Sequence, residues 1–433
     1  MTNYYLGVDL GSTTSKAIII DDSEEIVGRG ITNTRSNYDV AVEVAKNEAK
    51  INGRFSFMRQ ELEGPDRSDA GLESLFSDLE IHFRYEQHLD KLLRLKEGAL
   101  QGAKQSALDP QVLIDIFDRM VPESYEVFLR LGNDKSRFFR DIAGMSFMRL
   151  ADEVSDRSPA FDFETLMSIY DKSIIRIENE LVEINFLDFM NRAVERMGDR
   201  LPSDLKDEFR RASLMAVERP FDIATMVGTG YGRTRLPFPR ECIKSEILCH
   251  GLGAHYMYPE TATVLDIGGQ DTKAIQLDKN GVVTSFHMND RCAAGCGRFL
   301  GYIADELNIG LHELGPLAMQ YDHVTRVNST CTVFSGVELR ERLSLGERRE
   351  NVLAGLHRAM VLRAMSLLAR SGGIRSEFTF TGGVAKNIAV VHFLEELMYA
   401  NYGRDITLNI NPDSIYTGAV GGSIFAKRIR EAS

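Results

Sequence analysis

Two stretches of the chain share one layout of strand, tight turn and strand. The first is Asp9-Leu10-Gly11-Ser12-Thr13-Thr14-Ser15-Lys16, and the second is Asp266-Ile267-Gly268-Gly269-Gln270-Asp271-Thr272-Lys273. In each stretch an aspartate ends an apolar strand, a glycine follows two residues later, and a lysine begins the next apolar strand. A unit of this kind used twice predicts two duplicated α/β lobes that face each other across a nucleotide site.

Small residues in the two turns allow backbone N–H groups and hydroxyls to approach a phosphate closely. The predicted phosphate-binding residues are Gly11, Ser12, Thr13, Thr14 and Lys16 in the first turn, Gly268, Gly269 and Lys273 in the second, and Gly382 and Gly383 in a third glycine turn. We expect Asp9 and its counterpart Asp266 to be catalytic through a hydrated Mg²⁺ ion. Gln270, at the tip of the second turn, is placed to orient an attacking water. The spacing fits neither a P-loop nor a dinucleotide-binding fold.

Two cysteines follow residues that favour helix starts. Asn289 and Asp290 precede Cys292, Ser329 and Thr330 precede Cys331, and a helical pattern follows each cysteine. A thiolate at a helix N-terminus is stabilised by the helix dipole, so its pKa falls and it binds metal readily. Iron–sulfur clusters usually take four thiolates, so these two predict half of a site that a second subunit completes. Two buried structural cysteines are the alternative.

The composition narrows the class of protein. A chain of 433 residues is expected to form two or three domains. Its net charge of −12 argues against a nucleic-acid partner. We find no apolar run of the roughly 18 residues that a membrane span needs, and no signal-peptide pattern. Five irregularly spaced cysteines favour free thiols or metal ligands over disulfides. These features predict a soluble, cytoplasmic protein without a membrane partner.

Residues 37–220 have few glycines and a helical spacing of apolar residues, which predicts a mostly helical insertion within the first lobe. Asp109-Pro110 and Pro202-Ser203 indicate helix starts. The residues expected to line buried helix faces are Leu113, Phe117 and Met120 on one helix, and Leu166, Ile169, Tyr170, Ile174 and Ile177 on another. Such helices either pack on one another and on the lobe or provide a docking surface for partner subunits.

In chain order, DLGSTTSK, DIGGQDTK and TGGVAKN resemble the phosphate-1, phosphate-2 and adenosine motifs of the acetate kinase, sugar kinase, heat-shock chaperone and actin superfamily. Three further motifs are TGYGR at Thr229–Arg233, NDRCAAGCGRFL at Asn289–Leu300 and STCTVF at Ser329–Phe334. Together they resemble the activators of 2-hydroxyacyl-CoA dehydratases and the two related ATPase subunits of ATP-dependent benzoyl-CoA reductase. The match covers residues 1–36 and 221–433. The length, the AAGCGR form and the insertion are similar to the larger reductase ATPase subunit.

This resemblance implies an actin-like ATPase body of two ribonuclease-H-like lobes. The expected divisions are a first lobe at 1–36 and 221–259, the insertion at 37–220, a second lobe at 260–405, and a C-terminal segment at 406–433 that returns to the first lobe. Within the second lobe, Cys292 and Cys331 would bind a [4Fe–4S] cluster. Cys296 stands where the dehydratase activators carry threonine, which leaves open a rival arrangement in which all three cysteines serve one cluster within the chain.

The activity implied by the resemblance is ATP-driven electron transfer. MgATP would bind between the lobes, and the cluster would bridge this chain and the homologous smaller ATPase subunit. A ferredoxin-type donor would supply low-potential electrons, which pass to two catalytic subunits that bind and reduce an aromatic acyl-CoA such as benzoyl-CoA.

Three other functions stay open at this point. One is activation of a 2-hydroxyacyl-CoA dehydratase, in which the electron is used catalytically. Another is a small-molecule kinase of the same superfamily, which needs an acceptor and a base but no metal-ready cysteines. A chaperone-like ATPase would need a peptide-binding domain after the nucleotide body, and the sequence predicts none.

Overall fold

The computed structural model describes residues 2–34, 37–62, 70–106, 108–130, 138–157, 161–181, 184–236, 238–289, 295–327 and 332–432. The chain divides into two compact units. Unit 1 comprises Met1–Ala49 and Asp222–Ser433, and unit 2 comprises Lys50–Phe221. Helix α1 (Tyr38–Leu62) begins in the first unit and continues into the second. The remainder of unit 2 is helical over its described residues, as the sequence of the insertion predicts.

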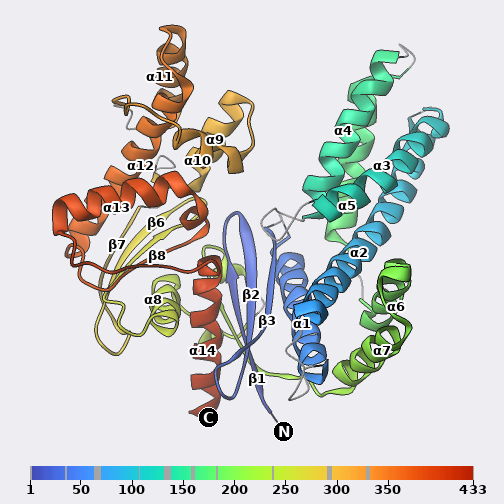
Figure 1. The fold of residues 1–433 in the computed structure, drawn as a ribbon, viewed down its shortest axis with the longest axis horizontal. Coiled ribbons are helices and arrows are strands. Elements are labelled where there is room, and N and C mark those ends of the chain that lie inside the picture. Colours follow the sequence, from blue (N-terminus) through green and yellow to red (C-terminus); the bar gives the residue numbers. More distant parts are fainter. Residues whose placement is uncertain are drawn as a thin grey trace. The chain divides into compact units, whose positions relative to one another are not determined.

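Unit 1 contains two sheets of matching topology. The strands of the first sheet are β1 (Tyr4–Leu10), β2 (Thr14–Asp21), β3 (Ile26–Asn33) and β4 (Ile223–Thr229), in the order β3-β2-β1-β4. The strands of the second are β5 (Thr263–Ile267), β6 (Thr272–Leu277), β7 (Val283–Asn289), β8 (Phe378–Thr381) and β9 (Leu408–Ile410), in the order β7-β6-β5-β8-β9. Each sheet therefore has an antiparallel three-stranded meander followed by a parallel strand, which confirms the two duplicated lobes (Figure 1).

The duplication is exact in strand register at the turns. In the first sheet Asp9 pairs with Lys16 across the β1–β2 hairpin and with Thr229 on the parallel strand β4. In the second sheet Asp266 pairs with Lys273 and with Thr381 at the same positions. A glycine with positive φ follows each threonine, Gly230 at 94° and Gly382 at 91°. The repeat thus extends beyond the hairpin that the sequence comparison identified.

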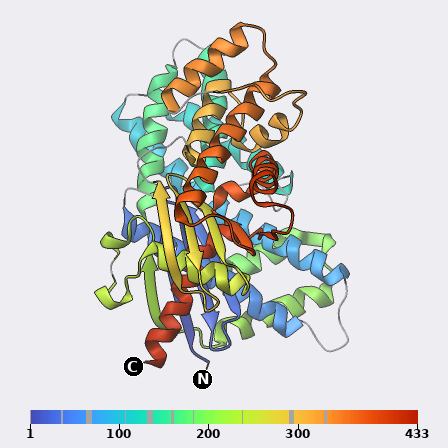
Figure 2. The same cartoon turned by 90° about the vertical axis from the view of Figure 1, so that its left-hand side faces the viewer.

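The helices of unit 1 beyond α1 are α8 (Glu246–Met257), α9 (Gly297–Leu307), α10 (Leu311–Ala318), α11 (Thr332–Ser344), α12 (Arg349–Ser371), α13 (Ile388–Tyr402) and α14 (Thr417–Glu431). Among them, α9 to α13 lie beside the second sheet, and α8 and α14 lie between the two sheets (Figures 1 and 2). Helices α9, α10, α12 and α13 share one apolar core with β5 and β8. By length and composition α12 could cross a membrane, but 61% of its apolar window is buried inside the protein, as in a core helix.

Helices α8 and α14 lie between the two sheets, and each packs on the sheet that does not immediately precede it in the sequence. Helix α14, the last element of the chain, packs on β1, β2 and β4 of the first sheet. Helix α8 follows β4 in sequence but packs on β5, β6 and β7 of the second sheet. The two helices contact each other through glycine backbone, because a Cβ atom on Gly421 would overlap the carbonyl of Cys249 and one on Gly253 would overlap the carbonyl of Thr417. The lobes are therefore joined by a backbone-to-backbone helix contact.

Unit 2 is organised on one long helix, α2 (Ala70–Gln105). The other helices are α3 (Pro110–Arg130), α4 (Phe139–Arg157), α5 (Phe163–Asn179), α6 (Phe186–Met197) and α7 (Ser203–Glu218). Helices α2 to α5 enclose one apolar core, in which Leu113, Phe117, Met120, Leu166, Ile169, Tyr170 and Ile174 are buried and Ile177 is partly buried, as predicted. Near α6 and α7, Phe55 makes edge-on ring contacts with Phe76, Phe83 and Phe186 at centroid distances of 5.0–5.9 Å. Unit 2 therefore has its own core.

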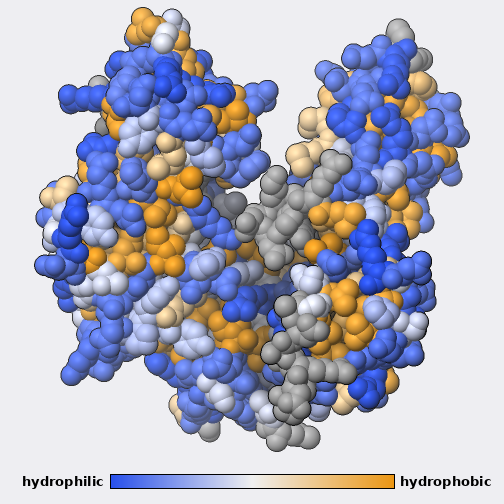
Figure 3. Space-filling model, viewed as in Figure 1, coloured by the Kyte–Doolittle hydropathy of each residue, from blue (hydrophilic) through white to orange (hydrophobic). Residues whose placement is uncertain are grey.

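The face drawn in Figure 3 is mostly hydrophilic, with smaller hydrophobic areas over both units. This agrees with the charged residues that make up 26% of the chain.

Candidate functional site

The two predicted phosphate turns meet in unit 1. A Cβ atom on Gly269 of the second turn would overlap the side chain of Thr13 in the first, so the turns contact each other through glycine backbone. Each turn carries its predicted small residues: Gly11, Ser12 and Thr13 lie between β1 and β2 with Thr14 at the start of β2, and Gly268 and Gly269 lie between β5 and β6. Gln270 lies partly exposed at the tip of the second turn.

The third turn adjoins the second in space. Gly382 follows β8, and a Cβ atom on it would overlap the Ile267 carbonyl oxygen and lie 3.0 Å from Oδ1 of Asp266. Gly383, the next residue, is exposed. The predicted turn residues of all three motifs therefore lie in unit 1 around Asp9 and Asp266, and small residues of this kind suit the binding of a polyphosphate.

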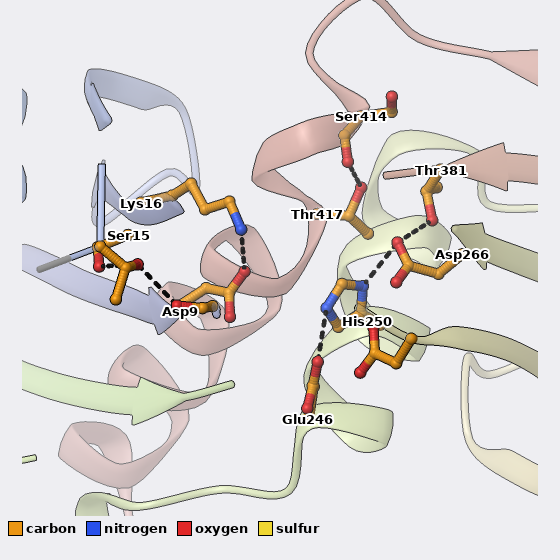
Figure 4. Close-up of polar contacts among 12 residues, drawn as sticks. Asp9, Ser15, Lys16, Glu246, His250, Asp266, Thr381, Ser414 and Thr417 are labelled. Carbon is orange, nitrogen blue, oxygen red and sulfur yellow. Dashed lines mark hydrogen bonds and ion pairs between the residues drawn. The ribbon is translucent and has the colours of Figure 1, made fainter. Parts of the chain in front are cut away.

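Asp9 is buried, yet one of its carboxylate oxygens lacks a partner among the described residues. Oδ2 accepts a hydrogen bond from Lys16 Nζ at 3.1 Å (Figure 4), whereas Oδ1 is buried without a hydrogen bond. The reason lies on β4, where Thr229 donates its hydroxyl to the Lys244 carbonyl at 3.2 Å instead of to Asp9. Leaving a buried carboxylate oxygen unpaired is unfavourable, so this atom is suited to accept a ligand such as Mg²⁺-bound water.

Asp266 has the same position in the second lobe but is fully paired. Thr381 donates its hydroxyl to Oδ1 at 2.9 Å, and Lys273 donates to Oδ2 at 3.2 Å. His250 Nδ1 forms an ion pair with Oδ1 at 3.4 Å (Figure 4). Burial alone would raise the pKa of Asp266, but the charges of His250 and Lys273 and the Thr381 hydroxyl outweigh it and hold the pKa well below the usual range.

Lys273 is the centre of a buried charge cluster that sequence reasoning did not identify. Its Nζ lies 2.9 Å from Glu246, 2.8 Å from Asp271 and 3.2 Å from Asp266, and its side chain is 1% exposed. Burial lowers the pKa of Lys273, but these three carboxylates raise it well above its ordinary value. The first-lobe counterpart, Lys16, forms an ion pair with Asp9 and has a side chain 12% exposed.

Glu246 and His250 come from α8, one turn apart on the same helix face. Their side chains reach the second lobe because α8 packs on the second sheet. Burial lowers the pKa of His250, but the charge of Asp266 outweighs it and raises the pKa above the usual value. Their i, i+4 spacing was the available signal, but the sequence alone could not show that α8 covers the other lobe's sheet.

Both predicted cluster ligands, Cys292 and Cys331, lie outside the described residues, as do Asp290, Ser329 and Thr330. Among the residues that are described, no group of three or more His, Cys, Asp or Glu side chains could hold a metal ion. Helix α11 begins at Thr332, next to Cys331, as expected. Helix α9 begins at Gly297, and the expectation that a helix begins at Cys292 falls on residues outside the described part of the chain.

The start of α9 at Gly297 has a physical cause. Cys296 has an extended backbone and is the N-cap residue, and the next two N–H groups are hydrogen-bonded to carbonyls of the second phosphate turn. Cys296 is 1% exposed and packs in the core of the second lobe. The rival three-cysteine arrangement also depends on Cys292, which lies outside the described residues.

Comparisons with known proteins agree with this architecture. A model of the BadF/BadG/BcrA/BcrD ATPase family matches residues 6–426. The activator of lactoyl-CoA dehydratase from Anaerotignum propionicum is 41% identical over 205 residues, which are 47% of this chain and 76% of the activator. One of the subunits of benzoyl-CoA reductase from Thauera aromatica is 31% identical over 253 residues, which are 58% of this chain and 87% of that relative.

The fold has a solved counterpart. The crystal structure of component A of (R)-2-hydroxyglutaryl-CoA dehydratase from Acidaminococcus fermentans matches with a TM-score of 0.56 at 22% identity, covering 100% of both chains. At this identity the match supports the actin-like ATPase fold. Because the family model spans nearly the whole chain, this protein belongs to the BadF/BadG/BcrA/BcrD ATPase family.

Proposed function

We propose that this chain is the ATP-hydrolysing, electron-transfer subunit of an enzyme that reduces the aromatic ring of benzoyl-CoA or a related aromatic acyl-CoA. The observation that carries the ATPase part is the buried, unpaired Oδ1 of Asp9 beside two facing phosphate turns. The family and its benzoyl-CoA reductase member support the reductase part. We further propose that it acts in the cytoplasm as the larger of two ATPase subunits.

In this proposal the residues of unit 1 bind and orient MgATP. The N–H groups and hydroxyls of Gly11 to Thr14 and the N–H group of Gly269 hold the phosphates, and the Gly382-Gly383 turn adjoins the nucleoside. Gly268 shapes the second turn, because its N–H donates to the Asp271 carbonyl at 3.0 Å. Asp9 orients the hydrated Mg²⁺ through its free oxygen, while Lys16 holds the other oxygen in place. Gln270, at the tip of the second turn, orients the attacking water.

Cys292 and Cys331 would hold a [4Fe–4S] cluster together with two thiolates of the smaller ATPase subunit. That group supplies one-electron chemistry at low potential, with a ferredoxin-type protein as donor and two catalytic subunits as acceptors. Of the two helices that follow the cysteine motifs, α9 bonds to the second phosphate turn through the N–H groups of Gly297 and Arg298.

A Cys292→Ala variant tests the ligand assignment. We expect it to lose most of its iron and visible absorption in anaerobic preparations, and to bind ATP as tightly as the unaltered chain does. Cys242→Ser is the matched control, because Cys242 is a partly buried free thiol outside the motif. Full iron content in Cys292→Ala would remove the cluster assignment.

A dehydratase activator is the second candidate, because the activator relative has the higher identity, 41% against 31%. The two functions differ in whether the electron is consumed in each turnover. Anaerobic co-purification identifies the partner subunits, and the amount of ATP consumed per product molecule then distinguishes the two functions. A fixed ATP requirement for every product molecule supports the reductase, and many product molecules per ATP support the activator. An iron-free chain that phosphorylates a small molecule would overturn both.

A further inference from the structure

The turn that follows β4 lies against the carboxylate of Asp9. Gly230 has a positive φ of 94°, and a Cβ atom on it would lie 2.4 Å from Oδ1 of Asp9 and 2.6 Å from the Leu10 carbonyl oxygen. Gly232 donates its N–H to the same carbonyl at 3.0 Å. The two glycines therefore let the backbone of this turn approach the end of β1 more closely than any side chain would permit.

The turn leads into a short 3₁₀ helix, Arg233–Arg235, which begins with an arginine. The backbone N–H of Arg233 and its side-chain Nη1 both donate to the Gly230 carbonyl at 3.2 Å. The guanidinium is thus held at the residue that lies against Oδ1 of Asp9. Among the residues that the structure describes, it has no carboxylate partner. Most donors of its planar fork are therefore available to an anionic ligand.

The second lobe has the same turn without the arginine. Thr381-Gly382 has the register of Thr229-Gly230, and a 3₁₀ helix at Gly383–Lys386 follows it. Counted from the threonine, the residue that corresponds to Arg233 is Ala385, which is 5% exposed. The charge at this position is therefore specific to the first lobe, where the aspartate at the end of β1 has an oxygen without a partner in the described part of the chain.

The charges around the two phosphate turns favour a further cation beside a polyphosphate. Lys16 is paired with Asp9, and Lys273 is paired with Asp266 and two other carboxylates (Figure 4). Even with His250 charged, the carboxylates of this group outnumber its cations by four to three: Asp9, Asp266, Asp271 and Glu246 against Lys16, Lys273 and His250. A triphosphate adds negative charge to this group, so a cation without a carboxylate partner stabilises the complex.

The position of Arg233 favours the terminal phosphate over the rest of the nucleotide. In the proposed function the Gly382-Gly383 turn of the second lobe adjoins the nucleoside. Arg233 instead lies in the first lobe, beside the oxygen of Asp9 that orients the hydrated Mg²⁺. In ATP-hydrolysing sites the metal ion bridges the last two phosphates, so a group beside its ligand is close to the bond that breaks. A planar arginine fork also bonds a phosphoryl group bidentately.

We propose that Arg233 binds the terminal phosphate of ATP and stabilises the negative charge that develops on it during hydrolysis. The inference rests on the proposed ATPase function and deepens it. As the water oxygen bonds to the terminal phosphorus, the bond from that phosphorus to the bridging oxygen breaks, and ADP leaves with the bridging oxygen. One water proton stays on the inorganic phosphate and the other passes to solvent. Arg233 keeps its own protons and acts through charge and hydrogen bonds.

Nucleotide titration of the full chain tests this assignment without depending on iron or on turnover. The ligands are MgADP and the Mg²⁺ complex of the slowly hydrolysed analogue ADPNP, which carries the additional phosphate. In Arg233→Met we expect the analogue to bind about 10- to 100-fold more weakly, because hydrogen bonds to a charged group are lost, and MgADP to bind within about threefold of the unaltered chain. ATP hydrolysis by this variant should fall about a thousandfold or more.

Two further variants separate the loss of this contact from a general effect of charge or folding. Arg235→Met removes the other arginine of the same short helix, which lies over the Tyr38 ring at 5.7 Å from its centroid. It should change neither affinity by more than about twofold. Arg233→Lys keeps the charge without the planar fork, and should bind the analogue more tightly than Arg233→Met but less tightly than the unaltered chain.

The inference is overturned if Arg233→Met binds both nucleotides as tightly as the unaltered chain does. It is also overturned if this variant, shown by circular dichroism to be folded, loses affinity for both nucleotides equally, because the arginine would then not distinguish the terminal phosphate. An unaltered chain that binds neither nucleotide would defeat the proposed function itself. Normal binding by the unaltered chain with no change in Arg233→Met would defeat this inference alone.

Discussion

The two phosphate turns have the same strand register and opposite states of pairing. Asp9 has one partner, Lys16, and a buried oxygen without a partner among the described residues. Asp266 is bonded by Thr381, Lys273 and His250, and Lys273 bonds two further carboxylates. Duplication has preserved the backbone while the partners diverged. In the first turn one oxygen of Asp9 can still accept a hydrogen bond from a ligand, whereas in the second turn Asp266 and Lys273 are paired with neighbouring side chains.

The largest expected difference between the copies concerns the two lysines. Lys273→Met removes the cation that balances the buried Asp266 and two partly buried carboxylates, Glu246 and Asp271, so we expect a loss of about 3–5 kcal/mol in the free energy of unfolding. Lys16→Met leaves one carboxylate, Asp9, without its cation and should cost less, about 1–2 kcal/mol, while weakening MgATP binding. Urea unfolding and nucleotide titration measure both effects. Equal losses of stability would show that the second cluster is no more tightly integrated than the first.

The next prediction concerns the support of the third turn. Asn387 caps α13, because its side-chain oxygen accepts hydrogen bonds from the N–H groups of Ala389 and Val390. Its Nδ2 donates to Nε2 of His357 at 3.2 Å. Ser245, at the corresponding start of α8, makes no side-chain cap bond. Burial lowers the pKa of His357 to about 4, because the charged ring is poorly solvated there.

The unfolded chain therefore binds a proton at His357 between about pH 6.5 and pH 4, and the folded chain does not. Above about pH 6.5 His357 is uncharged in both states, and its burial costs no stability. As the pH falls below about 6.5, protonation of the unfolded chain lowers the free energy of unfolding by up to about 3 kcal/mol. Denaturant unfolding over this range should show a steeper pH dependence for the natural chain than for His357→Gln. Parallel curves would mean that the pKa of His357 is the same in the folded and unfolded protein.

The smallest difference concerns the two threonines. Thr381→Val removes the hydroxyl from Asp266 and should cost about 1.5–3 kcal/mol, as expected for a hydrogen bond to a charged group. Thr229→Val removes a bond to a neutral carbonyl and should cost about 0.5–1.5 kcal/mol. Thermal unfolding of both variants, with the Thr→Ser forms as controls, makes the comparison. A larger loss at Thr229 would contradict the pairing described for the two aspartates.

The sequence predicted the parts of this site that repeat a local pattern. The Asp–Gly–Lys spacing was sufficient to place Asp9 opposite Lys16 and Asp266 opposite Lys273, because a hairpin determines its own register. The helical faces of the insertion followed from apolar spacing for the same reason. These features depend on residues close together in the chain.

The sequence did not predict the contacts that depend on tertiary structure. The equivalence of Thr229 and Thr381 appears only when β4 and β8 pair with distant strands. The role of His250 requires α8 to cross to the second sheet. The start of α9 at Gly297 depends on carbonyls of the second turn, which the local sequence around α9 does not reveal.

The exchange of α8 and α14 between the sheets also determines when the protein can fold during synthesis. The strands β1 to β3 are synthesised long before α14, but their apolar face is completed by Ala419, Val420 and Ile424 of α14. The first sheet must therefore stay partly open until α14 has been synthesised. A ribosome stalled before residue 417 would hold a first lobe without its last helix, which makes that nascent chain a substrate for chaperones.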